Sequence, residues 1–159
     1  SCVGISASYQ SAALSLNGTG TLRTIEGSPE FAKLAKETLA DLQFQDTTVI
    51  TGPFNTMLGD VLESSKPVDY FFNDGHHEHD AVIQYFQQLL PYAIDGTTVV
   101  VDDIRWSTGM LQAWNEIGDH PSVCTSVELE KIGIAVIGKQ SSTRSRFRIP
   151  SLRASDFRC

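Results

Sequence analysis

Residues 71–80, FFNDGHHEHD, place an acidic residue and three histidines directly behind an apolar stretch. Asp74 follows the apolar residues, and His77 lies three positions further on, where a loop could direct its imidazole at a substrate. Because histidine has an unperturbed pKa near neutrality, His77 is a candidate general base and Asp74 a candidate partner. We expect His76 and His79 to be surface or supporting groups, and the residues after His77 mainly to begin the next helix.

Two more carboxylates, Asp102 and Asp103, end the apolar run GTTVVVDDI. In open α/β sheets ligands bind outside the carboxyl ends of the strands, so we expect Asp74, Asp102 and Asp103 to lie at one edge of a sheet. Close like charges repel unless a cation or a shared proton relieves them, and a set of oxygen ligands suits hard ions such as Mg²⁺. The alternative is that Asp74 and Asp102 cap the helices that follow them.

Glu26 ends another strand-like run, 22 positions after Gly4 in the small-residue turn SCVGIS. A carboxylate at this distance from a glycine-containing turn can accept hydrogen bonds from both hydroxyls of a ribose. An acidic residue at a strand end is also commonly a solvated or capping group. The turn lacks a complete GxGxxG, which weakens the case for a dinucleotide, but its small residues let the backbone approach a ligand closely.

The elements that must position these residues alternate between apolar runs and amphipathic stretches, which predicts an α/β fold with a doubly wound, mostly parallel sheet. Strands are expected at residues 21–27, 47–52, 68–74 and 95–104, and an antiparallel C-terminal pair at 122–129 and 132–138. Helices are expected at residues 7–16, 28–42, 54–65, 79–93 and 108–118. In the second helix we expect one buried face made of Phe31, Leu34, Ala35, Thr38, Leu39 and Leu42.

Composition narrows the class of protein. The 159 residues suffice for one ordinary domain, and the 41% hydrophobic and 19% charged content is that of a globular protein. No apolar run approaches the roughly 20 residues that a membrane span needs. The N-terminus has no signal-peptide pattern and the three cysteines have no CxxC spacing, so we expect reduced thiols, no structural zinc site and a cytoplasmic location.

Charge divides the chain into an acidic body and a basic end. Residues 1–138 carry a net charge of -12 and residues 139–159 one of +5. We therefore predict a domain over 1–138 and a basic C-terminal tail over 139–159, either a solvated or loosely docked extension or a contact for an acidic partner. The acidic body argues against a nucleic-acid partner.

Taken together, these motifs resemble class I S-adenosylmethionine-dependent methyltransferases, and most closely the O-methyltransferases of the catechol and caffeoyl-CoA type and their bacterial relatives with a DGxH pattern. The resemblance spans about residues 1–138 and rests on SCVGIS, TIEGSPE, ITGPF, VDYFFNDGHH and GTTVVVDDIRWS, in that order. It implies that S-adenosyl-L-methionine is the cofactor. It implies cofactor contacts from Gly4, Ser6, Glu26, Gly52, Phe54, Asn55 and Asp74.

The resemblance also implies that the protein transfers a methyl group to a hydroxyl oxygen of a small-molecule acceptor. Asp74, Asp102 and Asp103 would hold a divalent metal, and His77 would stand where the catechol-type enzymes carry a catalytic lysine. Asp103 stands where asparagine is common, which adds a charge to the metal set. Trp106 would flank the acceptor, unless it packs in the core as we also expect of Trp114.

One part of the family pattern is missing: the central first strand and the glycine that ends it would precede Ser1. We therefore expect an N-terminally truncated domain of reduced stability, with a homo-oligomer as one way of completing the sheet. Two alternatives remain open. One is a non-catalytic descendant that binds the cofactor or a protein partner. The other is an NAD-dependent enzyme, and the incomplete glycine pattern and the paired aspartates weaken this second interpretation.

Overall fold

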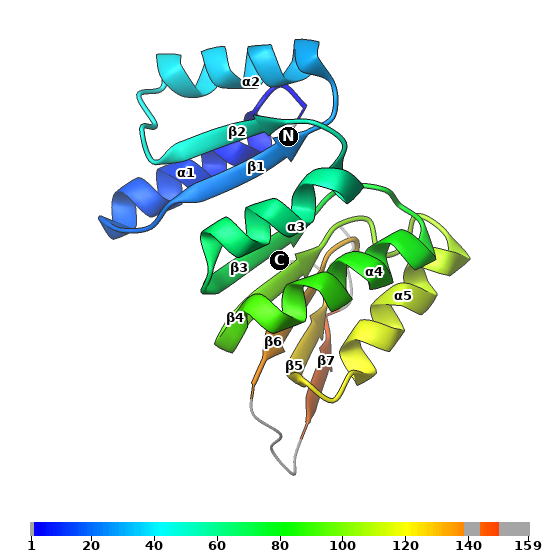
Figure 1. The fold of residues 1–159 in the computed structure, drawn as a ribbon. Coiled ribbons are helices and arrows are strands. Elements are labelled where there is room, and N and C mark those ends of the chain that lie inside the picture. The colour runs from blue at the N-terminus through cyan, green and yellow to red at the C-terminus, as the bar shows by residue number, and fades with distance from the viewer. Residues whose placement is uncertain (1, 139–143, 150–159) are drawn as a thin grey trace, which may run out of the picture. The chain divides into compact units, whose positions relative to one another are not determined.

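The structure, a computed structural model, describes residues 2–138 and 144–149 (Figure 1). The chain forms two compact units, here called the N-terminal unit (residues 1–65) and the C-terminal unit (residues 66–159). Both are built of alternating helices and strands, which confirms the predicted α/β class. Within the residues described, no helix combines the length and apolar character needed to cross a membrane.

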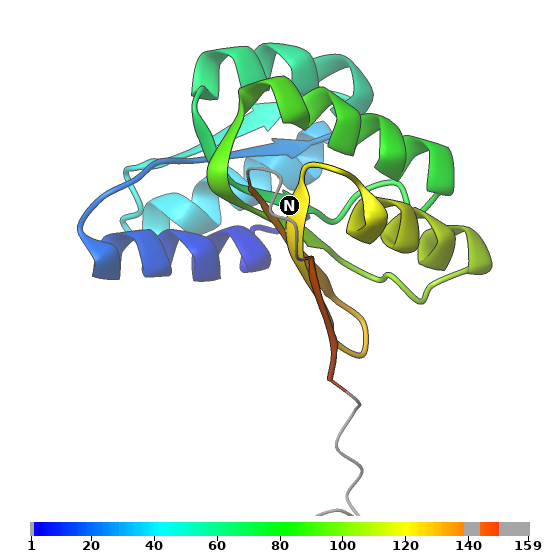
Figure 2. The ribbon, with the colours of Figure 1, turned by 90° about the horizontal axis from the view of Figure 1, so that it is seen from below.

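The N-terminal unit is a two-stranded parallel sheet covered by helices on both faces. Its elements are α1 (Ile5–Asn17), β1 (Leu22–Glu26), α2 (Pro29–Asp41), β2 (Thr47–Thr51) and α3 (Phe54–Ser65). Figure 2 shows α3 on one side of the β1–β2 sheet and α1 and α2 on the other. Because β1 and β2 pair in parallel from Leu22↔Thr47 to Glu26↔Thr51, Glu26 and the end of β2 lie at the same edge.

The buried face of α2 differs from the predicted one. Two alanines and one leucine at helical spacing pack against the sheet and α1, and each is at most 3% exposed: Ala32, Ala35 and Leu39. The larger apolar residues that we expected to share this face are 44–51% exposed: Phe31, Leu34 and Leu42. The prediction is confirmed for Ala35 and Leu39. It is wrong for the three larger residues, because the helix rests closely on its neighbours through alanines and these larger side chains face outward.

The C-terminal unit contains a five-stranded mixed sheet. Its elements are β3 (Val68–Asn73), α4 (His79–Leu89), the 3-10 turn η1 (Leu90–Tyr92), β4 (Ala93–Val101), α5 (Thr108–Asp119), β5 (Val123–Glu128), β6 (Gly133–Ile137) and β7 (Ser145–Arg148). The strand order is β3-β4-β6-β5-β7, with β6 antiparallel to both of its neighbours, so the predicted antiparallel pair is confirmed. Helices α4 and α5 lie side by side over one face of this sheet (Figures 1 and 2).

The core of the C-terminal unit is centred on Trp114, which is 1% exposed. A Cβ atom added to Gly133 in β6 would lie 2.5 Å from the Trp114 ring, so the indole packs directly on the strand backbone. The core prediction is confirmed for Trp114. It is wrong for Trp106, which is 71% exposed because it lies in the loop between β4 and α5 rather than on a helix face.

Part of the predicted basic tail is a strand. Residues 145–148 form β7, which pairs in parallel with β5 from Thr125↔Ser145 to Glu128↔Arg148. This segment is therefore docked on the sheet rather than solvated. Residues 139–143 and 150–159 of the tail lie outside the described residues, and the division at residue 138 stays a prediction.

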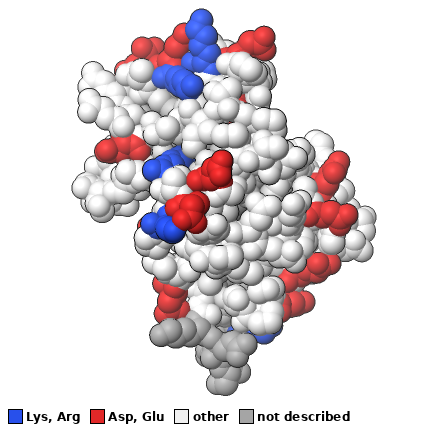
Figure 3. All heavy atoms as spheres, viewed as in Figure 1, with Lys and Arg blue, Asp and Glu red and all other residues white. Residues whose placement is uncertain are grey.

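On the face shown in Figure 3, acidic side chains lie at several separate places and basic side chains lie close to some of them. At the top of that view, over α2, basic and acidic side chains lie near one another. One such pair is Lys33 and Glu37, which form an ion pair at 3.8 Å. Cys2 and Cys124 are free thiols, as expected of reduced cysteines.

Candidate functional site

Glu26 ends β1 with its carboxylate held by backbone N–H groups. Its Oε2 accepts the N–H of Cys2 at 2.7 Å and its Oε1 accepts the N–H of Ser28 at 3.0 Å. Partial burial raises the pKa of Glu26 and the hydrogen bonds from Ser28 and Cys2 are among the causes that lower it, and its pKa lies below its ordinary value. A fixed, ionised carboxylate at the end of a strand has the character needed to accept ribose hydroxyls.

Gly4 is the N-terminal cap of α1, where the backbone conformation and the packing both favour a glycine. Its φ of +91° is in the left-handed region, and an added Cβ would lie 3.1 Å from the Cα of Ala35 in α2. The helix pair α1 and α2 therefore approaches closely at this point. Ser6 lies partly buried in the first turn of α1.

The predicted adenine-side residues follow β2. The N–H of Gly52 donates to the backbone oxygen of Glu26 at 2.9 Å, which joins the two strand ends. Phe54, half-buried, and Asn55, exposed, begin α3 immediately afterwards. All the predicted cofactor residues except Asp74 thus belong to the N-terminal unit.

In the C-terminal unit the ends of β3 and β4 are adjacent, as predicted. The N–H of Asp102 donates to the backbone oxygen of Asn73 at 2.9 Å. The buried side chain of Asn73 accepts the N–H of Gly75 at 3.4 Å and so bends the chain just after Asp74. The sequence interpretation missed Asn73, although a polar residue at the end of an apolar strand was a usable signal.

The carboxylates at this edge are arranged by an unusual backbone turn. Asp103 has φ +50°, and its N–H donates to Oδ1 of Asp102 at 2.8 Å. Burial and the neighbouring negative charge of Asp102 raise the pKa of Asp74, while the proximity of His77 opposes this rise. The three aspartates are therefore close enough to repel one another.

His77 lies between two of these carboxylates. Its Nε2 is 3.8 Å from Oδ1 of Asp74 and 3.7 Å from Oδ2 of Asp103. This nitrogen is buried and has no hydrogen-bond partner among the described residues. The imidazole also lies against the ring of Trp106, with 5.7 Å between centroids and 34° between planes. A buried ring nitrogen without a partner, flanked by two carboxylates, can take up a proton and hold the resulting charge.

The three aspartates at this edge form a set of possible metal ligands. Hard oxygen donors are present in Asp74, Asp102 and Asp103, so the chemistry of the donors suits Mg²⁺. In the described part of the chain, however, no group of three or more His, Cys, Asp and Glu side chains is arranged to hold a metal ion. The arrangement therefore does not fit a preformed metal centre, and metal binding at these aspartates stays a prediction.

The other two histidines of residues 71–80 make contacts that hold the fold together. Nδ1 of His76 shares a hydrogen bond with the hydroxyl of the buried Tyr85 at 2.8 Å. His79 lies between Asp80 and Glu116, with 2.8 Å to each carboxylate, and these two hydrogen bonds raise its pKa. His79 thereby links the start of α4 to α5.

A family described as a methyltransferase domain matches residues 1–104, well over half of the chain. The chain belongs to this methyltransferase family. The matched residues include Glu26, Asp74, His77 and both members of the Asp102–Asp103 pair. The resemblance inferred from the sequence motifs is confirmed.

Solved structures share the methyltransferase fold at low sequence identity. The O-methyltransferase TomG from Streptomyces achromogenes, solved with S-adenosylmethionine, matches with a TM-score of 0.70 and 21% identity over 86% of this chain and 70% of TomG. An O-methyltransferase from Bacillus cereus, solved with S-adenosylhomocysteine, matches with a TM-score of 0.61 and 22% identity over 74% of this chain and 63% of that one. MycE of the mycinamycin pathway, solved with Mg, S-adenosylhomocysteine and mycinamycin VI, matches with a TM-score of 0.59 and 16% identity over 87% of this chain and 40% of MycE.

These similarities establish the methyltransferase fold, and the activity has to be argued from the residues. The chain spans 62–63% of the length of several of the structures it matches, including that from Bacillus cereus. No curated protein sequence matches the chain.

Proposed function

We propose that this chain is the core of an S-adenosylmethionine-dependent O-methyltransferase in which His77 accepts the proton of a hydroxyl group on a small-molecule acceptor. The observation that carries the proposal is the buried, unpartnered Nε2 of His77 between the carboxylates of Asp74 and Asp103. S-adenosylmethionine, when bound, supplies an electrophilic methyl group on a sulfonium. The residues of the chain supply binding and proton transfer.

In the proposed reaction the hydroxyl oxygen forms the new bond to the methyl carbon, the sulfur keeps the electron pair of the broken bond, and the hydroxyl proton passes to Nε2 of His77. Asp74 and Asp103 stabilise the imidazolium that results, because each places a carboxylate oxygen within 4 Å of the ring nitrogen. Trp106 lies on the ring and restricts its orientation. Glu26, in the N-terminal unit, is the residue proposed to hold the ribose.

The first test separates cofactor binding from proton transfer. Calorimetric titration with S-adenosylhomocysteine should show binding to the wild-type chain and to His77→Gln, and its loss in Glu26→Ala. Methyl transfer to a panel of hydroxylated acceptors should fall by about 10²–10⁴-fold in His77→Gln. The matched control is His79→Gln, which removes an imidazole that bridges two helices and should leave transfer within about twofold.

Each outcome has a distinct meaning. Binding of S-adenosylhomocysteine without transfer to any acceptor would favour the non-catalytic binding protein. Full transfer by His77→Gln would refute the role of His77 and leave the cofactor site standing.

Metal dependence is a separate hypothesis that rests on the donor chemistry of Asp74, Asp102 and Asp103. Its test is the rate of transfer after treatment with a chelator, followed by titration with Mg²⁺. Loss and recovery of the rate would support a metal at the aspartates, and an unchanged rate would remove the metal from the proposal.

A further inference from the structure

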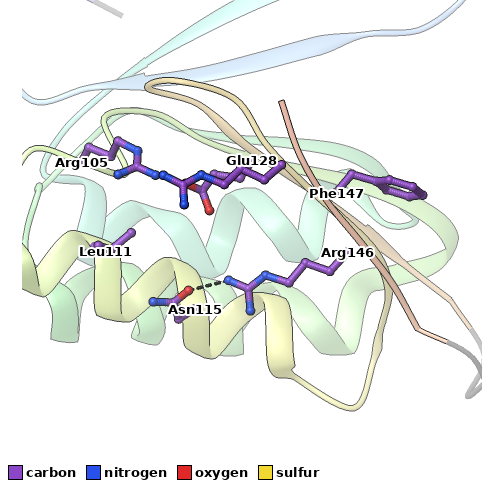
Figure 4. A pocket seen from close by; sticks show the side chains of 7 residues that line it. Arg105, Leu111, Asn115, Glu128, Arg146 and Phe147 are labelled. Atoms are coloured by element: carbon purple, nitrogen blue, oxygen red, sulfur yellow. Dashed lines mark hydrogen bonds and ion pairs between the residues drawn. The ribbon is translucent and has the colours of Figure 1, made fainter. Parts of the chain in front are cut away.

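A polar pocket lies on the C-terminal unit among α5, the loop after β4 and strand β7 (Figure 4). Its volume is about 380 Å³, and its lining residues are Arg105, Leu111, Asn115, Glu128, Arg146, Phe147 and Arg148. None of these residues takes part in the proposed methyl transfer. Three of the seven are arginines, an unusual concentration in a chain with a net charge of -7.

Glu128 organises the inner part of the pocket. It is 8% exposed, and its Oε1 accepts a hydrogen bond from Nη2 of Arg105 and lies 3.5 Å from Nε of Arg148. One buried carboxylate oxygen thus draws two guanidinium groups together. Each guanidinium carries five N–H donors, so contact with a single oxygen leaves donors for a ligand.

Arg146 forms the outer wall. Its Nη2 donates to Oδ1 of Asn115 on α5 (Figure 4). Its Nη1 lies 3.3 Å from Oδ1 of the exposed Asp119. Because Arg146 and Arg148 are alternate residues of β7, their side chains leave the same face of that strand. With three arginines and one glutamate, the lining carries a formal net charge of +2.

We propose that this pocket binds the phosphoryl group of a small phosphorylated molecule. A phosphate monoester carries a charge of about -1.5 to -2 at neutral pH, which balances the charge of the lining. Planar guanidinium forks match the geometry of phosphate oxygens and bind them through paired N–H groups. The volume lies in the range of about 300–1,000 Å³ that is typical of small-molecule sites, so the pocket has room for an organic group beside the phosphate.

The competing explanation is that these ion pairs only clamp β7 to the sheet. A clamp needs the Glu128 contacts but binds no added anion. Calorimetric titration of the full chain with phenyl phosphate and with inorganic phosphate, at low ionic strength, distinguishes the two. The phosphoryl site predicts saturable binding of phenyl phosphate at one molecule per chain, tighter than that of inorganic phosphate.

The matched variants are Arg146→Gln and Arg144→Gln, which change the net charge equally at neighbouring positions. Arg146 lines the pocket, whereas Arg144 donates to the backbone oxygen of Asp119 and does not line it. Arg146→Gln should weaken phenyl phosphate binding about tenfold or more, and Arg144→Gln by less than about twofold. Circular dichroism of both variants verifies the fold, and Arg148→Gln is a second variant should Arg146→Gln not fold.

Three results would overturn the proposal. They are the absence of saturable binding by a folded wild-type chain, equal weakening by the two matched variants, and binding of inorganic phosphate as tight as that of phenyl phosphate. The last would exclude a site built for a phosphorylated organic molecule. The experiment needs neither S-adenosylmethionine nor an acceptor, so its failure is independent of the methyltransferase proposal.

Discussion

Replacing Gly4 by alanine tests whether this residue is a structural glycine, as its packing indicates. The added methyl group faces two separate costs. A left-handed φ costs a residue with a Cβ atom about 1–2 kcal/mol. The methyl group would also meet the Cα of Ala35 at 3.1 Å, and a backbone atom cannot rotate away as a side chain can. Overpacking of this kind costs about 1–3 kcal/mol.

Gly18, at the other end of the same helix, is the matched control. Its φ is +71°, yet an added Cβ would meet nothing within 4 Å. Gly18→Ala therefore carries the backbone cost without the steric one, and both substitutions gain the same small benefit from a less flexible unfolded chain. We expect a loss of unfolding free energy of about 1 kcal/mol for Gly18→Ala and of about 2–4 kcal/mol for Gly4→Ala.

The assay is urea unfolding followed by far-ultraviolet circular dichroism, with the slope of free energy against urea compared among the three proteins. If the slope of free energy against urea is unchanged, the urea concentrations at half-unfolding can be compared directly. If Gly4→Ala is no more destabilised than Gly18→Ala, the close approach of α1 to α2 at Ala35 is wrong, and a role for Gly4 in ligand approach becomes the better explanation for a glycine there.

Three further substitutions test the C-terminal unit. Asp74→Asn should raise the melting temperature at neutral pH, because the raised pKa of Asp74 means that the fold disfavours its charged carboxylate. This gain in melting temperature should vanish as the pH falls below the pKa of Asp74. A gain that persists in acid would contradict the argument. Glu116→Gln should lower the free energy of unfolding at about pH 5 and have little effect on it at about pH 9. The reason is that the raised pKa of His79 makes the stabilisation by charged His79 complete below the ordinary histidine pKa, and this stabilisation is lost as the pH rises through the raised pKa. Equal loss at both pH values in urea unfolding would count against this. Gly133→Ala should cost about 1–3 kcal/mol in urea unfolding because its methyl group would meet the Trp114 ring at 2.5 Å, and a neutral result would show that the ring can move aside.

Local signals predicted the elements well. Ser28 accepts the N–H of Phe31 at 3.4 Å and Pro29 occupies the first turn of α2, as expected of a helix start. The side of that helix which is buried was predicted less well, because larger apolar residues were given priority over alanines. Which stripe packs inward depends on how closely α1 and α2 approach, and the close contact at Gly4 is a tertiary property that helical periodicity does not contain.

The candidate site shows the same division between local and long-range information. Because the carboxyl ends of adjacent parallel strands meet at one edge of a sheet, Asp74 and Asp102 were predicted to be neighbours. The hydrogen bond from the N–H of Asp102 to the backbone oxygen of Asn73 confirms that the two strand ends are adjacent. Two features of the site could not be predicted: the left-handed turn at Asp103 and the unpartnered nitrogen of His77. Both depend on the conformations of two loops that are distant in sequence. The catalytic and cofactor-binding roles of these residues stay predictions.

The basic tail shows why composition alone misleads. Its arginines were compatible with a solvated extension, a loosely docked one or a contact for an acidic partner, and composition could not choose among these. In the structure two of the arginines pair with side chains contributed by α5 and β5. Glu128, the buried partner of Arg148, is an ordinary-looking residue at the end of a short strand. A carboxylate can be buried at this position only because cations meet it there, and that pairing joins residues about twenty positions apart that no local pattern connects.

The loop after β4 supplies side chains to two clusters of different chemistry. Asp103 directs its carboxylate to His77, whereas Arg105, two residues later, pairs with Glu128 in the phosphoryl pocket. Between them Ile104 is fully buried, and its N–H donates to the backbone oxygen of Lys131 at 2.9 Å. This anchor fixes the loop to the segment between β5 and β6, so that the flanking side chains leave it in different directions. The buried isoleucine therefore lies between two clusters of opposite character on one short loop: the carboxylates beside His77 and the arginines beside Glu128.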